Sequence, residues 1–131
     1  MILFQVDVQE ESDIIIVRQK CREAAQNLKF GIIDQTRIIT AASELSRNIF
    51  EYASKGKVII EQIFSKDRQG ISLTFEDEGP GIENIELAMK SGYSKSDGLG
   101  LGLPGSQKLM DEFYISSIVG RGTKVIIKKW L

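Results

Sequence analysis

Histidine is absent from this chain, and cysteine occurs only once, at Cys21. Without an imidazole the chain cannot supply a Ser-His-Asp triad, a histidine metal site or a phosphoacceptor histidine. A single cysteine cannot form a disulfide within the chain, which favours a reducing compartment, and its position inside a helical pattern favours ordinary packing. These absences exclude several classes of active site and predict a cytoplasmic protein.

A surplus of charge and long apolar runs are also lacking. The 17 basic and 18 acidic residues give a formal net charge of −1, so no general attraction to nucleic acid or anionic lipid is expected. No apolar run approaches the roughly 20 residues that cross a bilayer, and the acidic start MILFQVDVQEESD predicts no signal peptide. A chain of 131 residues with 42% hydrophobic residues fits one domain over residues 1–131.

Segments in which every second residue is apolar, as in strands, and segments in which apolar residues recur at helical spacing follow one another along the chain. The pattern predicts strands over 2–8, 57–64 and 71–76, the last two joined by a turn at DRQG. It predicts a helix over 13–28 capped by Ser12 or Asp13, and a second helix capped by Asp34 that runs to about Ala53. The remaining expected elements are a short helix over 82–91, a mobile loop over 91–102, a helix ending near Phe113, and a hairpin of strands 114–120 and 123–130. We therefore predict an α+β protein, a two-layer α/β sandwich with a mixed, mainly antiparallel sheet.

The segment ELSRN, residues 44–48, lies on the second expected helix. Glu44 and Asn48 are four residues apart and share one side of that helix, at the border of its apolar stripe. A half-shielded carboxylate there can serve as a general base, and an amide oxygen can bind Mg²⁺. A solvated helix flank would carry the same residues, so both interpretations remain open. The stripe consists of Ile38, Ala41, Ala42, Leu45, Ile49 and Tyr52.

The segment DEGPG, residues 77–81, directly follows an expected strand. One interpretation is ordinary turn chemistry. The other is a binding loop, in which Asp77 accepts a hydrogen bond from a buried exocyclic amine. Gly79 and Gly81 would then let the backbone approach a flat ring, and Pro80 would stiffen the loop.

A glycine-rich segment precedes the expected fourth helix. Glycine N–H groups beside a helix N-terminus can hold phosphate, although this run matches neither a Walker A loop nor a Rossmann turn. The alternating leucines should anchor the segment, which predicts that Leu101 or Leu103 is buried. Lys90 and Lys95 could add positive charge. The segment comprises Gly98, Leu99, Gly100, Leu101, Gly102 and Leu103.

In this order the motifs ELSRN, DEGPGI, GLGLGL and GT (Gly122, Thr123) resemble the conserved boxes of the GHKL ATPase superfamily, which has the Bergerat fold. The resemblance covers about residues 10–131 and implies ATP and Mg²⁺ as cofactors. It implies Glu44 as the base, Asn48 as the magnesium ligand and Asp77 as the residue that reads adenine. The other nucleotide-binding residues that it implies are Gly79, Gly81, Ile82, the segment from Gly98 to Leu103, and Thr123.

Within that superfamily, ELSRNIFEYASKG, GLGLPG and LMDEF resemble the RsbT group of bacterial serine kinases, relatives of the anti-sigma factor SpoIIAB. The resemblance implies Mg-ATP-dependent phosphorylation of a serine or threonine on a STAS-domain antagonist in a partner-switching (stressosome-type) pathway. A PP2C-type phosphatase or a sigma factor would be a further partner. The alternative is an anti-sigma or switch protein that binds its partners without phosphotransfer. The ATP domain of a histidine kinase fits less well, because the chain has no phosphoacceptor histidine and no dimerisation helices.

Overall fold

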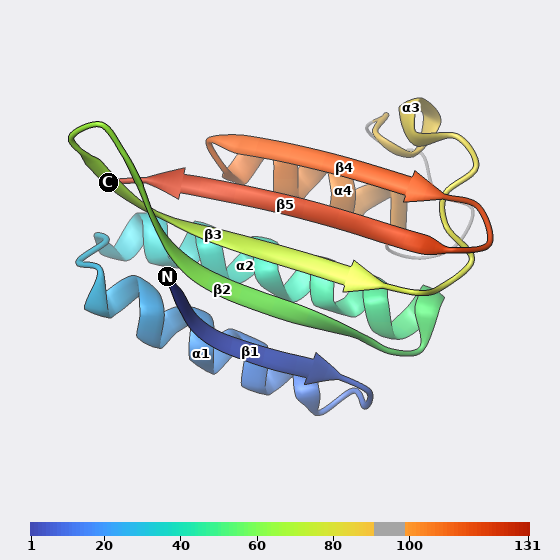
Figure 1. The fold of residues 1–131 in the computed structure, drawn as a ribbon, viewed down its shortest axis with the longest axis horizontal. Helices are drawn as coiled ribbons and strands as arrows, with labels where there is room; N and C mark the ends of the chain where they lie inside the picture. The colour runs from blue at the N-terminus through green and yellow to red at the C-terminus, as the bar shows by residue number, and fades with distance from the viewer. Residues whose placement is uncertain (91–98) are drawn as a thin grey trace.

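The computed structural model describes residues 1–90 and 99–131, with residues 99–102 as backbone only. Five strands form one sheet in the order β1-β2-β3-β5-β4, and all four pairings between them are antiparallel. Figure 1 shows these strands side by side, with the helices behind them. The strands are β1 (Ile2–Val8), β2 (Gly56–Ser65), β3 (Arg68–Asp77), β4 (Glu112–Ile118) and β5 (Gly122–Trp130).

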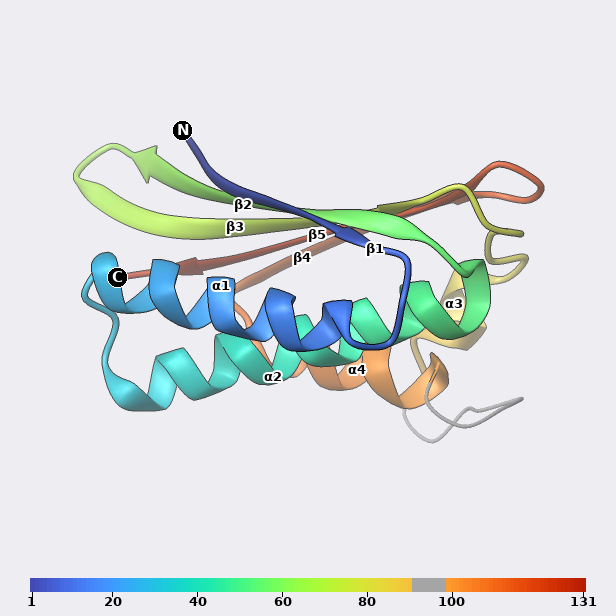
Figure 2. The ribbon, with the colours of Figure 1, turned by 90° about the horizontal axis from the view of Figure 1, so that it is seen from below.

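The described helices form a second layer on one face of the sheet, and none of them covers the other face, as Figure 2 shows. They are α1 (Asp13–Asn27), α2 (Ile32–Asn48), the π-helical turn η1 (Ile49–Ala53), α3 (Ile85–Ala88) and α4 (Leu99–Leu109). The two-layer α+β sandwich is confirmed, although none of the described strands pairs in parallel as a mixed sheet would require. None of the described helices is both long and apolar enough to cross a membrane.

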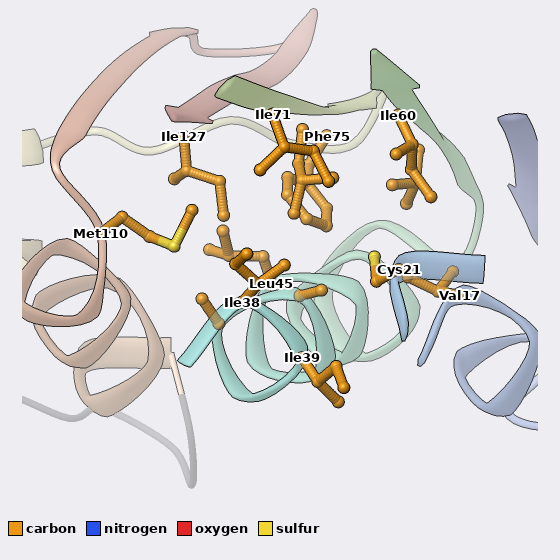
Figure 3. Close-up of a cluster of buried hydrophobic side chains, with 14 of the residues drawn as sticks. Val17, Cys21, Ile38, Ile39, Leu45, Ile60, Ile71, Phe75, Met110 and Ile127 are labelled. Atoms are coloured by element: carbon orange, nitrogen blue, oxygen red, sulfur yellow. The ribbon is translucent and has the colours of Figure 1, made fainter. Parts of the chain in front are cut away.

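The core lies between the layers and takes side chains from both (Figure 3). Val17 and Cys21 of α1 and Ile38 of α2 are completely buried, as are Ile60 of β2 and Ile127 of β5. Burial raises the pKa of the Cys21 thiol to about 12. The prediction that this cysteine is ordinary packing is therefore confirmed.

Several predicted boundaries differ from the structure. Helix α2 begins at Ile32 after the extended residue Gly31, so the prediction that Asp34 caps it is wrong. Ser12 makes no capping bond, and the Asp13 carboxylate instead accepts the N–H groups of the preceding turn at Gln9 and Glu10. The predicted DRQG turn is also displaced. Ser65 pairs with Arg68, so the chain reverses over residues 66–67, where Lys66 has a φ of 54°.

Helix α4 begins inside the glycine-rich segment, which had been expected to form a loop as far as Gly102. Burial of Leu103, 2% exposed, supplies packing that offsets the low helix propensity of glycine. This burial confirms the prediction made for Leu101 or Leu103. The helix ends at Leu109 instead of near Phe113, because the Asp111 N–H donates to the Lys128 carbonyl and the chain enters the sheet.

Candidate functional site

A cavity of about 110 Å³ lies at the end of the sheet where α2 ends and β5 begins. This is the right-hand end of Figure 1, where the β4–β5 turn and η1 also lie. Apolar side chains form most of its wall, and a few polar groups converge on it, which is the usual composition of a small-molecule site. The predicted site residues on its wall are Asn48, Asp77, Gly81, Ile82, Leu103 and Thr123.

Asp77 is the last residue of β3 and stands opposite Thr123 in the β3–β5 ladder. Its Oδ1 accepts the N–H of Gly79 at 2.9 Å and the N–H of Thr123 at 3.3 Å. Burial raises the pKa of this carboxyl group above its ordinary value, and the two backbone N–H groups partly oppose that shift. The described contacts engage one carboxylate oxygen, which leaves the second to receive a donor from a ligand.

Glycines allow the chain around Asp77 to pack closely against η1, the end of β4 and the start of β5. A Cβ on Gly79 would lie 2.5 Å from Cβ of Ala53 in η1. A Cβ on Gly81, whose φ is 79°, would lie 2.6 Å from the carbonyl oxygen of Ile118. Gly122 has a φ of 129°, and a Cβ there would overlap the Asp77 carbonyl group. These three glycines therefore have a packing role, while the approach of Gly79 and Gly81 to a flat ring stays a prediction.

Asn48 ends α2 and is one of the residues that line the cavity. Its Nδ2 is buried and has no hydrogen-bond partner among the described residues. The oxygen and the nitrogen of an amide side chain are told apart only by their hydrogen bonds. The Asn48 amide can therefore turn its NH₂ group toward a phosphate oxygen or its oxygen toward a cation. No group of three or more Cys, Asp or Glu side chains that could hold a metal occurs in the described part of the chain.

Glu44 lies one helical turn before Asn48 and is half-buried, as its place at the border of the stripe predicts. It does not line the cavity. The structure thus brings Asn48 together with Asp77 and Thr123, and it places Glu44 beside that group rather than within it.

The glycine-rich segment is described only in part. Gly98 and Lys95 lie outside the described residues, and Leu99, Gly100, Leu101 and Gly102 form the start of α4. Lys90 is exposed. The role of the segment toward phosphate therefore stays a prediction.

Sequence reasoning missed two contributions to the site. Tyr52, assigned to the core stripe, lies on the cavity wall because the π-helical turn follows α2 directly. Ser117 of β4 accepts the N–H of Ile82 at 2.7 Å, donates to the carbonyl of Gly122 at 2.9 Å, and lies 2.8 Å from Oγ1 of Thr123. A signal for Ser117 was available, because it continues the alternation that turns Phe113 and Ile115 toward the core.

Known proteins resemble this chain over most of its length. Residues 33–131 match the family described as histidine kinase-, DNA gyrase B-, and HSP90-like ATPase. Serine/threonine-protein kinase RsbT of Bacillus subtilis (strain 168) is 48% identical over 126 residues, which are 96% of this chain and 95% of that protein. An anti-sigma F factor of Clostridium acetobutylicum is 34% identical over 100 residues, covering 74% of this chain and 69% of that protein.

Among solved structures, a chain of the SiaB-SiaC complex from Pseudomonas aeruginosa superposes with a TM-score of 0.63, covering 99% of this chain and 91% of its own at 13% identity. The catalytic domain of histidine kinase ThkA gives a TM-score of 0.56 at 17% identity, covering 97% of this chain and 95% of its own. At such low identity these likenesses establish the fold alone. The sequence matches show that the chain belongs to the histidine kinase-, DNA gyrase B- and HSP90-like ATPase family and, within it, to the RsbT-type serine/threonine-protein kinases.

Proposed function

We propose that this protein transfers the γ-phosphoryl group of Mg-ATP to a serine or threonine of a STAS-domain partner in a bacterial partner-switching pathway. The observation that carries the proposal is the single cavity wall shared by Asn48, Asp77 and Thr123. These residues come from a helix, the end of one strand and the start of another. Their arrangement suits a ligand that has both an apolar ring and an anionic group.

Adenine would occupy the apolar part of the cavity beside Asp77. The free oxygen of this half-buried carboxylate would accept a hydrogen from the exocyclic amine, and Gly81 and Ile82 would line the ring. The raised pKa of Asp77 supports this role, because a poorly solvated carboxylate gains more from a ligand donor than a hydrated one does.

The triphosphate would extend from adenine toward the start of α4. The first N–H groups of a helix have no partner within that helix and attract anions. Leu103 of α4 lies on the cavity wall, so this helix begins close to the proposed nucleotide. Gly100 and Gly102 would let the backbone approach the phosphates.

Asn48 fits the magnesium ion that the family implies, since Mg²⁺ commonly uses one or two protein oxygens together with substrate phosphates. The buried Nδ2 has no partner among the described residues, so no described hydrogen bond of Nδ2 prevents the amide from turning its oxygen toward the ion. A magnesium ion there would neutralise charge on the phosphates.

Glu44 would act as the general base from its position one turn before Asn48. Its carboxylate accepts the hydroxyl proton as the serine oxygen attacks the γ-phosphorus. The bond from that phosphorus to the bridging oxygen breaks, and ADP leaves with the electron pair. The half-buried position of Glu44 keeps it within reach of solvent and of a docked protein.

The partner assignment rests on the relatives. The motifs that resemble the RsbT group imply a STAS-domain substrate and a PP2C-type phosphatase as a second partner, and the 48% identity to serine/threonine-protein kinase RsbT over 96% of this chain supports that resemblance. A reaction that consumes ATP in a protein with a free, buried thiol belongs in the cytoplasm.

The test is phosphotransfer from γ-labelled ATP to purified candidate STAS proteins, with ATP affinity measured in parallel. We expect Glu44→Gln to keep its ATP affinity and to lose roughly 10²–10⁴-fold in transfer rate. Glu23→Gln, on the exposed side of α1, is the matched control. A wild-type transfer rate in Glu44→Gln would remove the base assignment.

The adenine contact has its own test. Asp77→Asn should weaken ATP binding by roughly tenfold or more, because the amide offers a donor where the amine needs an acceptor. Asp67→Asn, in the exposed turn between β2 and β3, should bind as the wild type does. Equal ATP affinity in all three proteins would refute the contact.

A second candidate function is an ATP-dependent switch that binds a sigma factor without turnover, which the anti-sigma F relative favours. Tight complex formation with a partner and no labelled serine or threonine would select that function. Label on the partner would select the kinase.

A further inference from the structure

Ser117 connects three segments of the proposed adenine pocket. Its hydroxyl contacts the N–H of Ile82 in the loop after β3, the carbonyl of Gly122 and the hydroxyl of Thr123 in β5, at 2.7, 2.9 and 2.8 Å respectively. Ser117 does not line the cavity, so any effect on a ligand must pass through these partners.

The hydrogen atoms in this cluster can be assigned by counting. A serine hydroxyl has one hydrogen and two acceptor positions. The Gly122 carbonyl can only accept, so it takes the hydrogen of Ser117. The Ile82 N–H can only donate, so it fills one acceptor position. The remaining contact then requires Thr123 to donate its hydrogen to Ser117.

The consequence lies on the cavity wall. With its hydrogen committed to Ser117, the Thr123 hydroxyl can only accept hydrogen bonds from a ligand or a bound water. Asp77, its neighbour across the β3–β5 ladder, is also an acceptor when ionised. The Asp77 and Thr123 side chains therefore both present acceptors to a ligand at the β3–β5 end of the cavity.

We propose that Ser117 is a positioning residue that holds Thr123 as an acceptor and so makes the pocket select a purine with a 6-amino group over one with a 6-oxo group. The proposal rests on the proposed binding of adenine beside Asp77. A 6-oxo oxygen beside Asp77 would face two acceptors, the Asp77 carboxylate and the Thr123 hydroxyl. Without the Ser117 hydroxyl, Thr123 could turn its hydrogen toward that oxygen and partly accommodate it.

The experiment measures the dissociation constants of Mg-ATP and Mg-ITP for the full chain by calorimetry. The two nucleotides differ at the 6-position and in the accompanying N1 proton. Ser117→Ala should lower the ratio of the ITP constant to the ATP constant by roughly tenfold, the contribution of about one hydrogen bond. A merely structural loss of the contact to Ile82 would weaken both nucleotides together and leave the ratio unchanged.

Three further variants sharpen the test. Ser116→Ala makes the same change on the same strand at an exposed neighbour, and should keep the wild-type ratio. Ser117→Thr keeps the hydroxyl and should keep the ratio as well. In a Thr123→Val background, adding Ser117→Ala should not change the ratio, because Ser117 acts through the Thr123 hydroxyl.

The outcomes separate this inference from the proposed function. Failure of the wild type to bind ATP would overturn the proposed function and the inference with it. ATP binding with an unchanged ratio in Ser117→Ala would overturn the inference alone. If circular dichroism shows that Ser117→Ala is unfolded, Ser117→Cys replaces it, because a thiol is a poor acceptor for the Thr123 hydrogen. The same fall in ratio is then required.

Discussion

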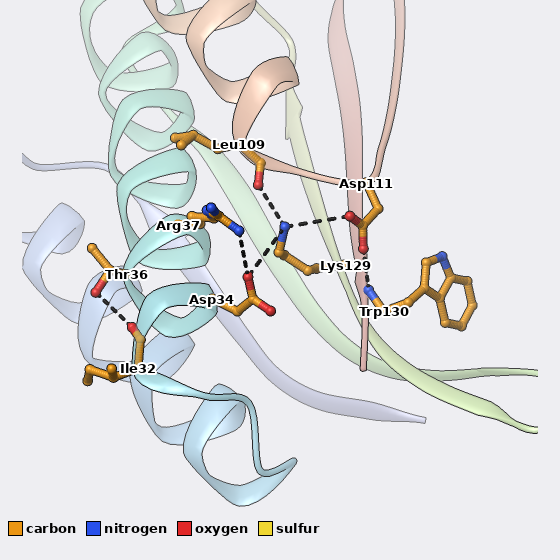
Figure 4. Close-up of polar contacts among 8 residues, drawn as sticks. All are labelled: Ile32, Asp34, Thr36, Arg37, Leu109, Asp111, Lys129 and Trp130. Carbon is orange, nitrogen blue, oxygen red and sulfur yellow. Dashed lines mark hydrogen bonds and ion pairs between the residues drawn. The ribbon is translucent and has the colours of Figure 1, made fainter.

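Replacing Lys129 by methionine should destabilise the fold without affecting the nucleotide site. Lys129 lies in β5 with its side chain only 7% exposed. Its ammonium donates to the Leu109 carbonyl at 2.9 Å and lies 3.7 Å from Asp34 and 3.6 Å from Asp111. Figure 4 shows that this one group joins the first turn of α2, the end of α4 and the sheet.

The expected cost follows from what methionine leaves behind. It fills nearly the same space as the lysine stem, so packing is largely kept. The Leu109 carbonyl at the end of α4 loses its donor, and leaving a buried acceptor unpaired costs about 1–3 kcal/mol. The two carboxylates are 35% and 43% exposed, so water replaces much of each ion pair. Such pairs contribute about 0–1 kcal/mol each. We expect a total loss of about 3 kcal/mol, which is on the order of 10 °C in Tm for a domain of this size.

Urea unfolding followed by circular dichroism measures this loss. Lys124→Met is the matched control, because Lys124 lies on the same strand, is 51% exposed and, among the described residues, forms an ion pair with Glu76 alone, at 3.5 Å. That change should cost less than about 0.5 kcal/mol. A loss below about 1 kcal/mol in Lys129→Met, or one equal to the control, would refute the reasoning. The folded variant should bind ATP normally, since Lys129 and Thr123 lie at opposite ends of β5.

Three further predictions concern single side chains. Ser106→Ala should raise the free energy of unfolding by about 1 kcal/mol, because the buried Ser106 hydroxyl has no partner among the described residues; a loss in urea unfolding would contradict this. Asp77→Asn should be more stable than the wild type at pH 7. Burial raises the folded-state pKa of Asp77, so this gain should shrink as pH falls through that pKa, and a gain in Tm that grows toward acid pH would contradict the assignment. Cys21 is fully buried with a pKa raised to about 12, so a thiol reagent should label it only after urea unfolds the chain, and rapid labelling of the native protein would disprove this burial.

Much of the fold follows from local patterns. The alternation of Ile2, Phe4, Val6 and Val8 predicts the bounds of β1 correctly. The 3.6-residue stripe from Ile38 to Ile49 predicts the buried face of α2 and of the start of η1. These predictions succeed because strand and helix periods are properties of neighbouring residues. The predicted capping of α2 by Asp34 fails because the extended residue Gly31 precedes the helix. The predicted extent of α4 fails because tertiary contacts decide it, namely the burial of Leu103 and the bond from the Asp111 N–H to the Lys128 carbonyl.

The sequence by itself determined the order of the elements and the residue types of the site, including Asn48, Asp77 and Thr123. The tertiary structure decided how they meet. The N–H of Thr123 bonds to a carboxylate 46 positions earlier, and this contact exists only because β5 lies between β3 and β4. The same strand order brings Ser117 to Thr123, and the other contacts of Ser117 then make the Thr123 hydroxyl the donor between the two. Period and propensity act over a few neighbours, whereas the direction of a hydrogen bond depends on every group that the folded sheet brings within reach of it.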